Sequence, residues 1–303
     1  MHQPHRRHLL AFLATSALYA ALPLPTARAA GTATTSLGEA LSALERAHGG
    51  RLGVQVVGLD GIPQAGHRAD ERFALCSTFK LLLAAVVLRE AQHGRIDLNR
   101  PIRFGKADLV PYAPVVEKHL DAGALSLREL AHATQTTSDN VAANLLLREL
   151  GGPEGFTEKL RELGDTITRI DRIEPQMNLV PSGEVRDTTT PRAMAETVHR
   201  LFTTDLLDEA SKATLKSWMI ETRTGLRRLR AGLPADWEVG DKTGTGVASG
   251  MANKHNDVAV VWRPGLPPLV IAAYWEADGY YPKTRPQDEA VLAEVGRLVA
   301  SAG

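Results

Sequence analysis

The stretch Ser77-Thr78-Phe79-Lys80-Leu81-Leu82-Leu83 begins a strongly apolar helix that the sequence predicts over residues 78–92. A serine and a lysine three residues apart lie on one face of such a helix, one turn from each other. The hydroxyl then lies at the helix N-terminus, where free N–H groups and the helix dipole favour a developing negative charge. A lysine packed among leucines is poorly solvated, which lowers its pKa towards that of a base. The stretch therefore predicts a nucleophile beside a proton acceptor, although an N-capping serine with a solvated lysine is the alternative that it leaves open.

Three more motifs follow at wide intervals, and each contains side chains that can bind substrate or move a proton. They are Ser138-Asp139-Asn140, Glu174-Pro175-Gln176-Met177-Asn178 and Lys242-Thr243-Gly244. Each motif is common alone, whereas all four in this order rarely occur together by chance. S-x-x-K, S-D-N and K-T-G are the signature of class A β-lactamases and penicillin-binding proteins. From about Ser36 to the C-terminus, the chain therefore resembles a class A serine β-lactamase.

The resemblance implies hydrolysis of β-lactam antibiotics through a serine acyl-enzyme, and hence antibiotic resistance. Ser77 would be the nucleophile, and Ser138 would relay a proton to the leaving nitrogen. The backbone N–H groups of Ser77 and Thr245 would form the oxyanion hole. Glu174 would activate the water that releases the acyl-enzyme. Whether Lys80 or Glu174 takes the proton of Ser77 stays open.

Two other classes share part of this motif set. A D,D-peptidase or penicillin-binding protein forms the same acyl-enzyme but releases it very slowly. Release that is about a million-fold faster requires a barrier about 8 kcal/mol lower, and the resemblance assigns that task to Glu174 and Asn178. A β-lactam sensor would lack this pair of side chains and would usually be tethered to a membrane.

The substrate carboxylate is expected to meet cations and hydroxyl groups. A cation roughly 4 Å away contributes about 4 kcal/mol at an effective dielectric near 20, before desolvation is counted. Residues 247–253 contain no arginine, so Arg228 is the expected second cation beside the K-T-G lysine. Arg223, Arg227 and Arg230 are the competing candidates. The substrate-binding residues that we expect are Asn140, Asn178, Lys242, Thr243, Gly244, Thr245, Tyr112 and Arg228.

Residues 172–187 form a loop without apolar periodicity, which the resemblance identifies as an Ω-loop. Arg172 and Asp187 bracket this loop and are expected to close its neck as an ion pair. The carboxylate of Glu174 and the amide of Asn178 can hold one water between them. The resemblance also implies a cis peptide bond after Glu174. An ordinary surface turn is the alternative that the loop alone would suggest.

The predicted elements occur in the order helix and strand, then helices, then strands and a final helix. This order is typical of an α+β chain whose two ends share one antiparallel sheet flanked by the N- and C-terminal helices. An all-helical sub-domain, residues 69–219 with the Ω-like loop, is then inserted between 30–68 and 220–303, and the active site lies in the cleft between the two parts. The helices that we expect cover 36–47, 78–92, 126–134, 141–150, 192–205 and 286–300, and the strands cover 51–59, 237–245, 257–262 and 269–275.

Residues 1–29 are predicted to be a signal peptide. Arg6 and Arg7 supply positive charge, residues 9–22 are mostly apolar, and Ala27-Arg28-Ala29 has the small-x-small form of a cleavage site. The apolar run is shorter than the roughly 20 residues that span a membrane. We therefore expect a secreted, periplasmic protein without a stable membrane anchor, exported by the general or the twin-arginine route.

The composition argues against several other classes. Lys+Arg and Asp+Glu number 35 each, so no net field attracts nucleic acid or an anionic membrane. No H-x-H or H-E-x-x-H spacing and no glycine-rich nucleotide motif occurs, so we expect neither a metal nor a cofactor. Cys76 is the single cysteine, so no intramolecular disulfide can form, and we expect it to be a small buried apolar group. We expect a monomer that acts on small-molecule β-lactam substrates.

Overall fold

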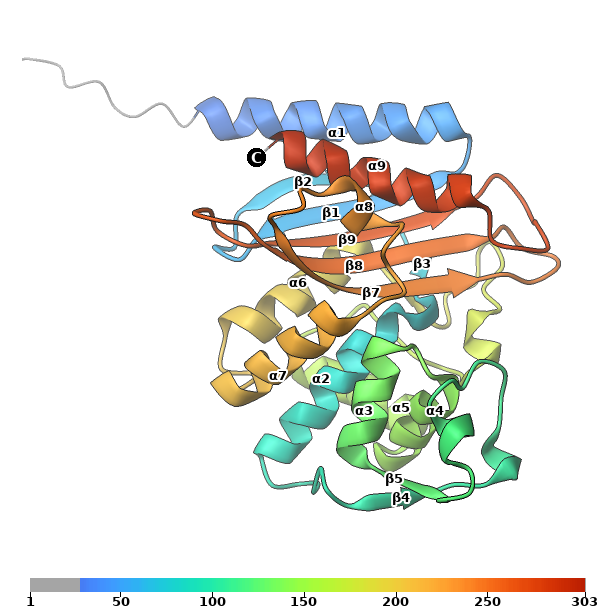
Figure 1. Cartoon of the computed structure of the whole chain (residues 1–303). Helices are drawn as coiled ribbons and strands as arrows, with labels where there is room; N and C mark the ends of the chain where they lie inside the picture. Colours follow the sequence, from blue (N-terminus) through green and yellow to red (C-terminus); the bar gives the residue numbers. More distant parts are fainter. Residues whose placement is uncertain (1–27, 303) are drawn as a thin grey trace, which may run out of the picture.

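A five-stranded antiparallel sheet forms the centre of the molecule (Figure 1). The structure is a computed structural model that describes residues 28–302. The strands are β1 (Arg51–Gly58), β2 (Pro63–His67), β7 (Glu238–Gly246), β8 (Lys254–Trp262) and β9 (Leu269–Glu276). They lie in the order β2-β1-β9-β8-β7, so the two ends of the chain share one sheet. The predicted α+β fold class is confirmed.

Strand β9 shows why the strand signals in this chain are apolar runs rather than alternating patterns. All its residues except the last are buried. Val270 and Ala272 belong to the core on one face of the sheet, whereas Ile271 and Ala273 belong to the core on the other face. Because successive side chains point to opposite faces, a strand covered on both sides must be apolar throughout.

Two helices from opposite ends of the chain, α1 (Arg28–His48) and α9 (Pro286–Ala302), cover one face of this sheet (Figure 1). The helix predicted at the C-terminus is therefore confirmed. Helix α1 begins before Ser36, so the start predicted there is wrong: residues 28–35 contain no proline that would prevent the helix from extending towards the N-terminus. Residues 1–27 of the predicted signal peptide lie outside the residues that the structure describes.

The other face of the sheet meets the helical part of the chain, built around α2 (Phe79–Gln92). Helix α2 is buried from Phe79 to Leu88, which explains why its sequence has no polar stripe. Helices α3 (Leu127–Thr136) and α4 (Asn140–Glu149) pack beside it. The capping box at the start of α3 is formed between Ser126 and Glu129. The three helices predicted in this region are confirmed, with ends shifted by a residue or two.

Two helices in this part were not predicted. Helix α5 (Gly152–Glu162) begins at the second glycine of the pair that follows α4, and Pro153 at its first turn suits a helix start. Helix α7 (Glu209–Glu221) buries only Ser211, Leu215, Trp218 and Met219, so its apolar face is too sparse to give a clear periodic signal. The predicted helix between them is confirmed as α6 (Pro191–Thr203).

The remaining elements are short. Two small ladders, β3 with β6 and β4 with β5, lie within residues 69–219. The division of the chain into two sub-domains at residues 69 and 219 stays a prediction. The short elements are β3 (Phe73–Ala74), β4 (Pro101–Arg103), β5 (Ala124–Ser126), β6 (Thr188–Thr189), α8 (Leu229–Gly232) and the 3₁₀ helices η1 (Cys76–Thr78), η2 (Lys106–Asp108), η3 (Val116–His119) and η4 (Gln176–Asn178).

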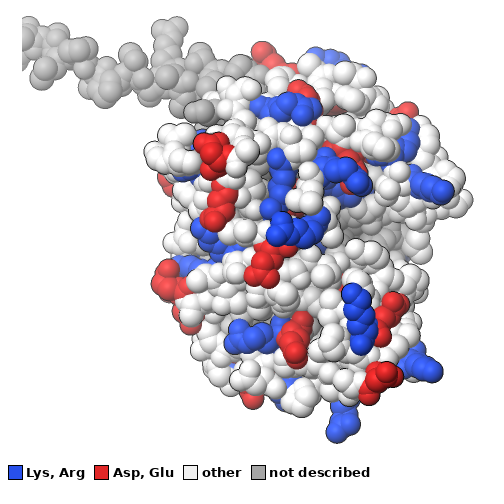
Figure 2. Space-filling model, in the orientation of Figure 1, with Lys and Arg blue, Asp and Glu red and all other residues white. Residues whose placement is uncertain are grey.

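Charged side chains of both signs are interspersed on the face seen in Figure 2. This distribution agrees with the equal numbers of acidic and basic residues in the sequence. Among residues 28–302, no helix has both the length and the apolar character needed to cross a membrane.

Candidate active site

A cavity of about 410 Å³ opens where the edge strand β7 meets the start of α2. Eight of the twelve predicted site residues line it, together with Thr224, which was not predicted. Three of the other four, Lys80, Glu174 and Lys242, are fully buried in the wall behind them. The lining residues are Ser77, Tyr112, Ser138, Asn140, Asn178, Thr224, Arg228, Thr243 and Thr245.

A tight turn presents the hydroxyl of Ser77 to this cavity. The preceding Cys76 is buried, as predicted, and has a φ of 44°, in the left-handed region that non-glycine residues rarely adopt. Gly244 of β7 lies against this turn. A Cβ at Gly244 would lie 2.9 Å from the carbonyl oxygen of Leu75 and 3.1 Å from Cβ of Cys76. Gly244 does not line the cavity, and its lack of a side chain lets the strand approach the turn that carries Ser77.

Lys80 is surrounded by hydrogen-bond acceptors. Its Nζ lies 3.0 Å from Oγ of Ser77 and 2.9 Å from Oε1 of Glu174. It also donates to the side-chain oxygen of Asn140 and, at 3.0 Å, to the backbone oxygen of Ser138. Oε1 of Glu174 is itself 3.5 Å from Oγ of Ser77. Both expected acceptors for the Ser77 proton therefore lie beside its hydroxyl.

Ser138 connects the two lysines of the site. Its Oγ lies 3.0 Å from Nζ of Lys242 and 3.4 Å from Nζ of Lys80, and its backbone has a φ of 63°. The neighbouring Asp139 caps α4 through the N–H of Ala142. Lys242 is buried, and burial, followed by the positive charge of Lys80, holds the pKa of Lys242 well below its usual value. Lys242 thus contacts Ser138 and does not reach the cavity surface.

Glu174 is held from two sides. Its bond to Pro175 is cis, as the resemblance implied. Nδ2 of Asn178 donates to Oε2 of Glu174 at 2.6 Å. Asn144 of α4 binds the backbone of Glu174 twice, because its Oδ1 accepts from the N–H at 2.9 Å and its Nδ2 donates to the carbonyl oxygen at 2.9 Å.

Arg228 is buried in the cavity wall, where its guanidinium is fixed by acceptors. It donates to Oγ1 of Thr245 at 2.6 Å and to the carbonyl oxygens of Gly244 and Asn256, each at 2.8 Å. Its Nε lies 3.3 Å from Oε1 of Glu289 on α9. These contacts orient the guanidinium beside the hydroxyl groups of β7.

The competing arginines are directed elsewhere. The side chain of Arg227 is 77% exposed, and it pairs with Glu289 at the protein surface. Arg230 pairs with the buried Asp241. Among the four candidate arginines, all within the described chain, Arg228 alone lines the cavity.

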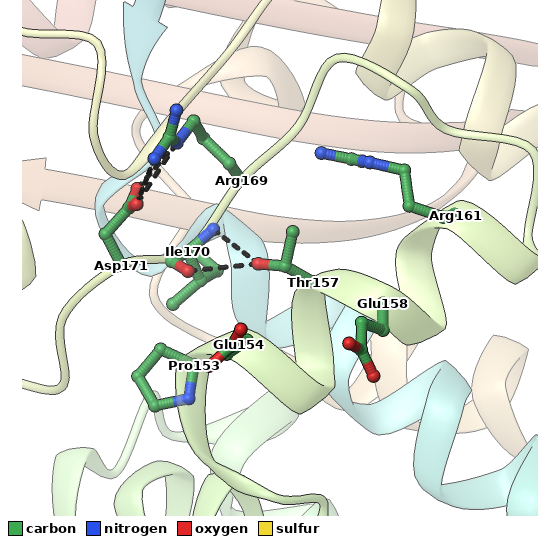
Figure 3. A pocket seen from close by; sticks show the side chains of 8 residues that line it. All are labelled: Pro153, Glu154, Thr157, Glu158, Arg161, Arg169, Ile170 and Asp171. Carbon is green, nitrogen blue, oxygen red and sulfur yellow. Dashed lines mark hydrogen bonds and ion pairs between the residues drawn. The ribbon is translucent and has the colours of Figure 1, made fainter.

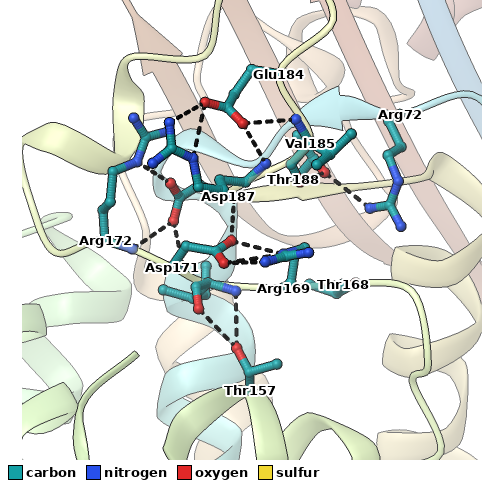
Figure 4. A network of polar contacts seen from close by, with 12 residues as sticks. Arg72, Thr157, Thr168, Arg169, Asp171, Arg172, Glu184, Val185, Asp187 and Thr188 are labelled. Carbon is teal, nitrogen blue, oxygen red and sulfur yellow. Dashed lines mark hydrogen bonds and ion pairs between the residues drawn. The ribbon is translucent and has the colours of Figure 1, made fainter. Parts of the chain in front are cut away.

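The neck of the Ω-loop is closed by the predicted ion pair, with Nε of Arg172 2.5 Å from Oδ2 of Asp187. Asp187 also accepts the backbone N–H groups of Asp171, at 2.7 Å, and of Arg172, at 3.0 Å. Figure 4 shows these contacts and the second pair, between Arg169 and Asp171. The loop that carries Glu174 therefore begins and ends at one polar network.

Comparisons with known proteins agree with this geometry. Residues 36–302 match the model of a β-lactamase enzyme family. The carbapenem-hydrolyzing β-lactamase KPC of Klebsiella oxytoca is 43% identical over 93% of this chain and 94% of its own length. The β-lactamase Toho-1 of Escherichia coli is 41% identical over 99% of this chain and 98% of its own. An ancestral (GNCA) class A β-lactamase structure, 49% identical, matches with a TM-score of 0.83 over 88% of this chain and 100% of its own.

The chain belongs to the class A β-lactamases. This class A β-lactamase hydrolyses the cyclic amide bond of β-lactam antibiotics and is a resistance enzyme. The alternative of a D,D-peptidase is thereby set aside.

Three residues of the β-lactamase site were missed in the sequence. Asn144 lies one helical turn after Asn140 on α4, a spacing that could have identified it. Oγ1 of Thr224 lies 2.7 Å from Oγ1 of Thr243, and Glu289 contacts Arg228 from the C-terminal helix. Neither of these two stands in a motif, so no local signal could have found them.

Within residues 28–302, His, Cys, Asp and Glu side chains form no group of three that could hold a metal ion.

Proposed function

We propose that Ser77 is acylated by the β-lactam with help from the two lysines and Ser138. Oγ of Ser77 bonds to the lactam carbonyl carbon while its proton passes to Lys80 or Glu174, both within reach. The ring C–N bond breaks, and Oγ of Ser138 gives its proton to the nitrogen. Ser138 is resupplied with a proton through its contacts with Lys80 and Lys242. The N–H groups of Ser77 and Thr245 stabilise the oxyanion.

Deacylation is assigned to Glu174 and Asn178. Glu174 takes a proton from a water whose oxygen attacks the ester carbonyl, the ester C–O bond breaks, and Oγ of Ser77 recovers the proton. The product leaves as a carboxylic acid. The contact of 2.6 Å between Nδ2 of Asn178 and Oε2 of Glu174 supports this role, because it fixes the carboxylate at the cavity wall.

The substrate carboxylate is assigned to Arg228 with the hydroxyl groups of Thr243 and Thr245, all of which line the cavity. Lys242 lies behind them, in contact with Ser138. We therefore propose that Lys242 acts mainly on the proton relay, and that Arg228 supplies the direct cation. Asn140 and Tyr112, also at the cavity surface, are assigned to the rest of the substrate.

The observation that carries the proposal is the convergence of Lys80 and Glu174 on Ser77, both fully buried and within 3.5 Å of its hydroxyl. Glu174→Ala removes the base that we assign to deacylation but leaves Lys80 as an acceptor during acylation. We expect a penicillin adduct to accumulate on intact-mass spectra, with release about a thousand-fold slower. Glu184→Ala, which removes an Ω-loop carboxylate paired with Arg186, is the control. An absence of adduct on the Glu174 variant would refute the deacylation role.

Penicillins and early cephalosporins are the proposed substrates. A relative of this chain is named as carbapenem-hydrolyzing, so carbapenems form the third class to test. Hydrolysis rates over a panel that begins with a chromogenic cephalosporin measure this range. Turnover of no penicillin in the panel would contradict the proposal.

We further propose that the protein is exported to the periplasm as a monomer, with residues 1–29 removed. The mass of protein purified from the periplasm should then begin at Ala30, and its elution on a sizing column should match one chain. A membrane-bound fraction that keeps residues 1–29 would contradict this proposal.

A further inference from the structure

Helices α4 and α5 each use one side chain to bind the backbone of a residue at the start of the Ω-loop or just before it. Asn144 of α4 binds both the N–H and the carbonyl oxygen of Glu174. Thr157 of α5 binds both backbone groups of Ile170, since its Oγ1 accepts from the N–H at 3.0 Å and donates to the carbonyl oxygen at 3.0 Å. The two contacts are of the same kind and lie four residues apart along the chain.

The segment 170–174 is therefore fixed at both of its ends. Ile170 at one end is buried in the helical core, and the catalytic carboxylate is at the other. Between them, Asp171 and Arg172 donate their N–H groups to Asp187, as Figure 4 shows together with Thr157. Every backbone link that holds this segment to the helices thus passes through Asn144 or Thr157, within the contacts found for the described residues.

We propose that Thr157 is a positioning residue for deacylation, acting through Ile170 on the segment that carries Glu174. The inference rests on the proposed role of Glu174. Thr157 itself contacts neither substrate nor the reacting atoms. Acylation depends less on this segment, because Lys80 keeps its contacts with Ser77, Ser138 and Asn140.

From the surroundings of Thr157 we expect that removal of its hydroxyl leaves the protein folded. A cavity of about 550 Å³ opens beside it, between α5 and residues 169–171, and is lined by Glu154, Glu158 and Arg161 of α5 (Figure 3). Water from this polar cavity can take over the hydrogen bonds of Ile170 when the hydroxyl is absent. The backbone groups are then satisfied, but the fixed link between α5 and the loop is lost.

The experiment compares three variants by rapid-mixing kinetics with a chromogenic cephalosporin and by intact-mass spectra. Thr157→Val keeps the shape and removes the hydroxyl, whereas Thr157→Ser keeps the hydroxyl. Val198→Ala, which shortens a buried side chain of α6 that lines neither the cavity at Ser77 nor the cavity at Thr157, is the control for lost stability. We expect Thr157→Val to slow deacylation about tenfold, in line with the cost of a small misplacement, and to leave acylation within about twofold. Thr157→Ser should match the parent in both steps.

The inference is overturned if Thr157→Val slows both steps in proportion, if its deacylation is unchanged, or if Val198→Ala produces the same split between the steps. Glu174→Ala separates this failure from failure of the proposed function. If that variant accumulates the adduct while Thr157→Val deacylates normally, only the positioning role is lost. If Glu174→Ala deacylates normally, the proposed function itself is lost.

Discussion

Backbone strain is concentrated around Ser77 and the Ω-loop. Five non-glycine residues of the described chain have a positive φ, and each such conformation costs about 1–3 kcal/mol. Four of them adjoin the cavity or close the Ω-loop. They are Cys76, Tyr112, Ser138 and Asp187. The strained backbone thus marks the same site as the motifs, by an independent observation.

Cys76 should be chemically inert in the folded protein. Burial raises the pKa of its thiol to about 12, so almost no thiolate, the reactive form, exists near neutral pH. We expect iodoacetamide at pH 8 to leave the intact mass unchanged, and to add one label when a denaturant is present. Labelling of the native protein at a rate similar to that of the unfolded protein would show that the thiol is accessible.

Arg228→Ala should weaken the binding of substrates that carry a carboxylate. Loss of a charged hydrogen-bond partner should raise KM by about 10- to 100-fold, with a smaller effect on an ester analogue of the same drug. Arg227→Ala is a matched control, because Arg227 is exposed and pairs with the same Glu289. Equal effects of Arg228→Ala on the acid and the ester would remove Arg228 from the carboxylate site.

Among the elements, the Ω-loop is closed at its neck by a buried ion pair. Asp187 is fully buried and receives three hydrogen bonds from Asp171 and Arg172. Breaking such a pair leaves the partners uncompensated, which costs about 3–5 kcal/mol. The closed neck is what allows a loop with little regular structure to hold a carboxylate in place.

Asp187→Ala should therefore lower the free energy of unfolding by about 3 kcal/mol, as measured by urea denaturation. Limited proteolysis should also cut within residues 172–187 faster than in the parent. Arg186→Ala, which breaks an exposed pair with Glu184 at the same loop, should change stability by less than about 0.5 kcal/mol. Similar losses for the two variants would mean that burial of the neck contributes little.

The sequence predicted elements well wherever a helix or strand buries a continuous apolar face. The strands β8 and β9 and the helix α2 are examples, since their burial is complete or nearly so. The sequence did not predict α7, which buries few residues, or α5, because the Gly151-Gly152-Pro153 stretch at its start indicates the end of α4. Contacts such as that between Arg228 and Glu289 join distant elements, so they could not be predicted without the fold.

For the whole molecule, stability should fall in mild acid because of a buried histidine. His255 of β8 is fully buried, and burial, with the charge of Arg228, lowers its pKa from 6.5 to about 4. The other charged groups that face it are Asp288, 3.6 Å away, Glu289 and Arg285. The unfolded chain takes up the proton first, so the contribution of His255 is complete above pH 6.5 and is lost as the pH falls towards 4.

Melting temperatures measured between pH 7 and pH 4 test this expectation. His255→Ala should give a shallower decline of Tm with falling pH than the parent, whatever its stability at pH 7. His93→Ala, at an exposed position after α2, should keep the slope of the parent. Identical slopes for the His255 variant and the parent would place the acid sensitivity elsewhere.

The strand order has a consequence for how this enzyme matures. Strand β1 pairs with β9, and Arg51 bonds Glu276 across 225 residues of chain. The hairpin of β1 and β2 therefore has no partner for the free edge of β1 until the chain as far as β9 is available. Pairing between segments so far apart in sequence is slow. Strand β7 joins the sheet only through β8 and β9. A chain that stops before β9 would therefore contain every side chain to which we assign a catalytic role, but it would not form a working enzyme.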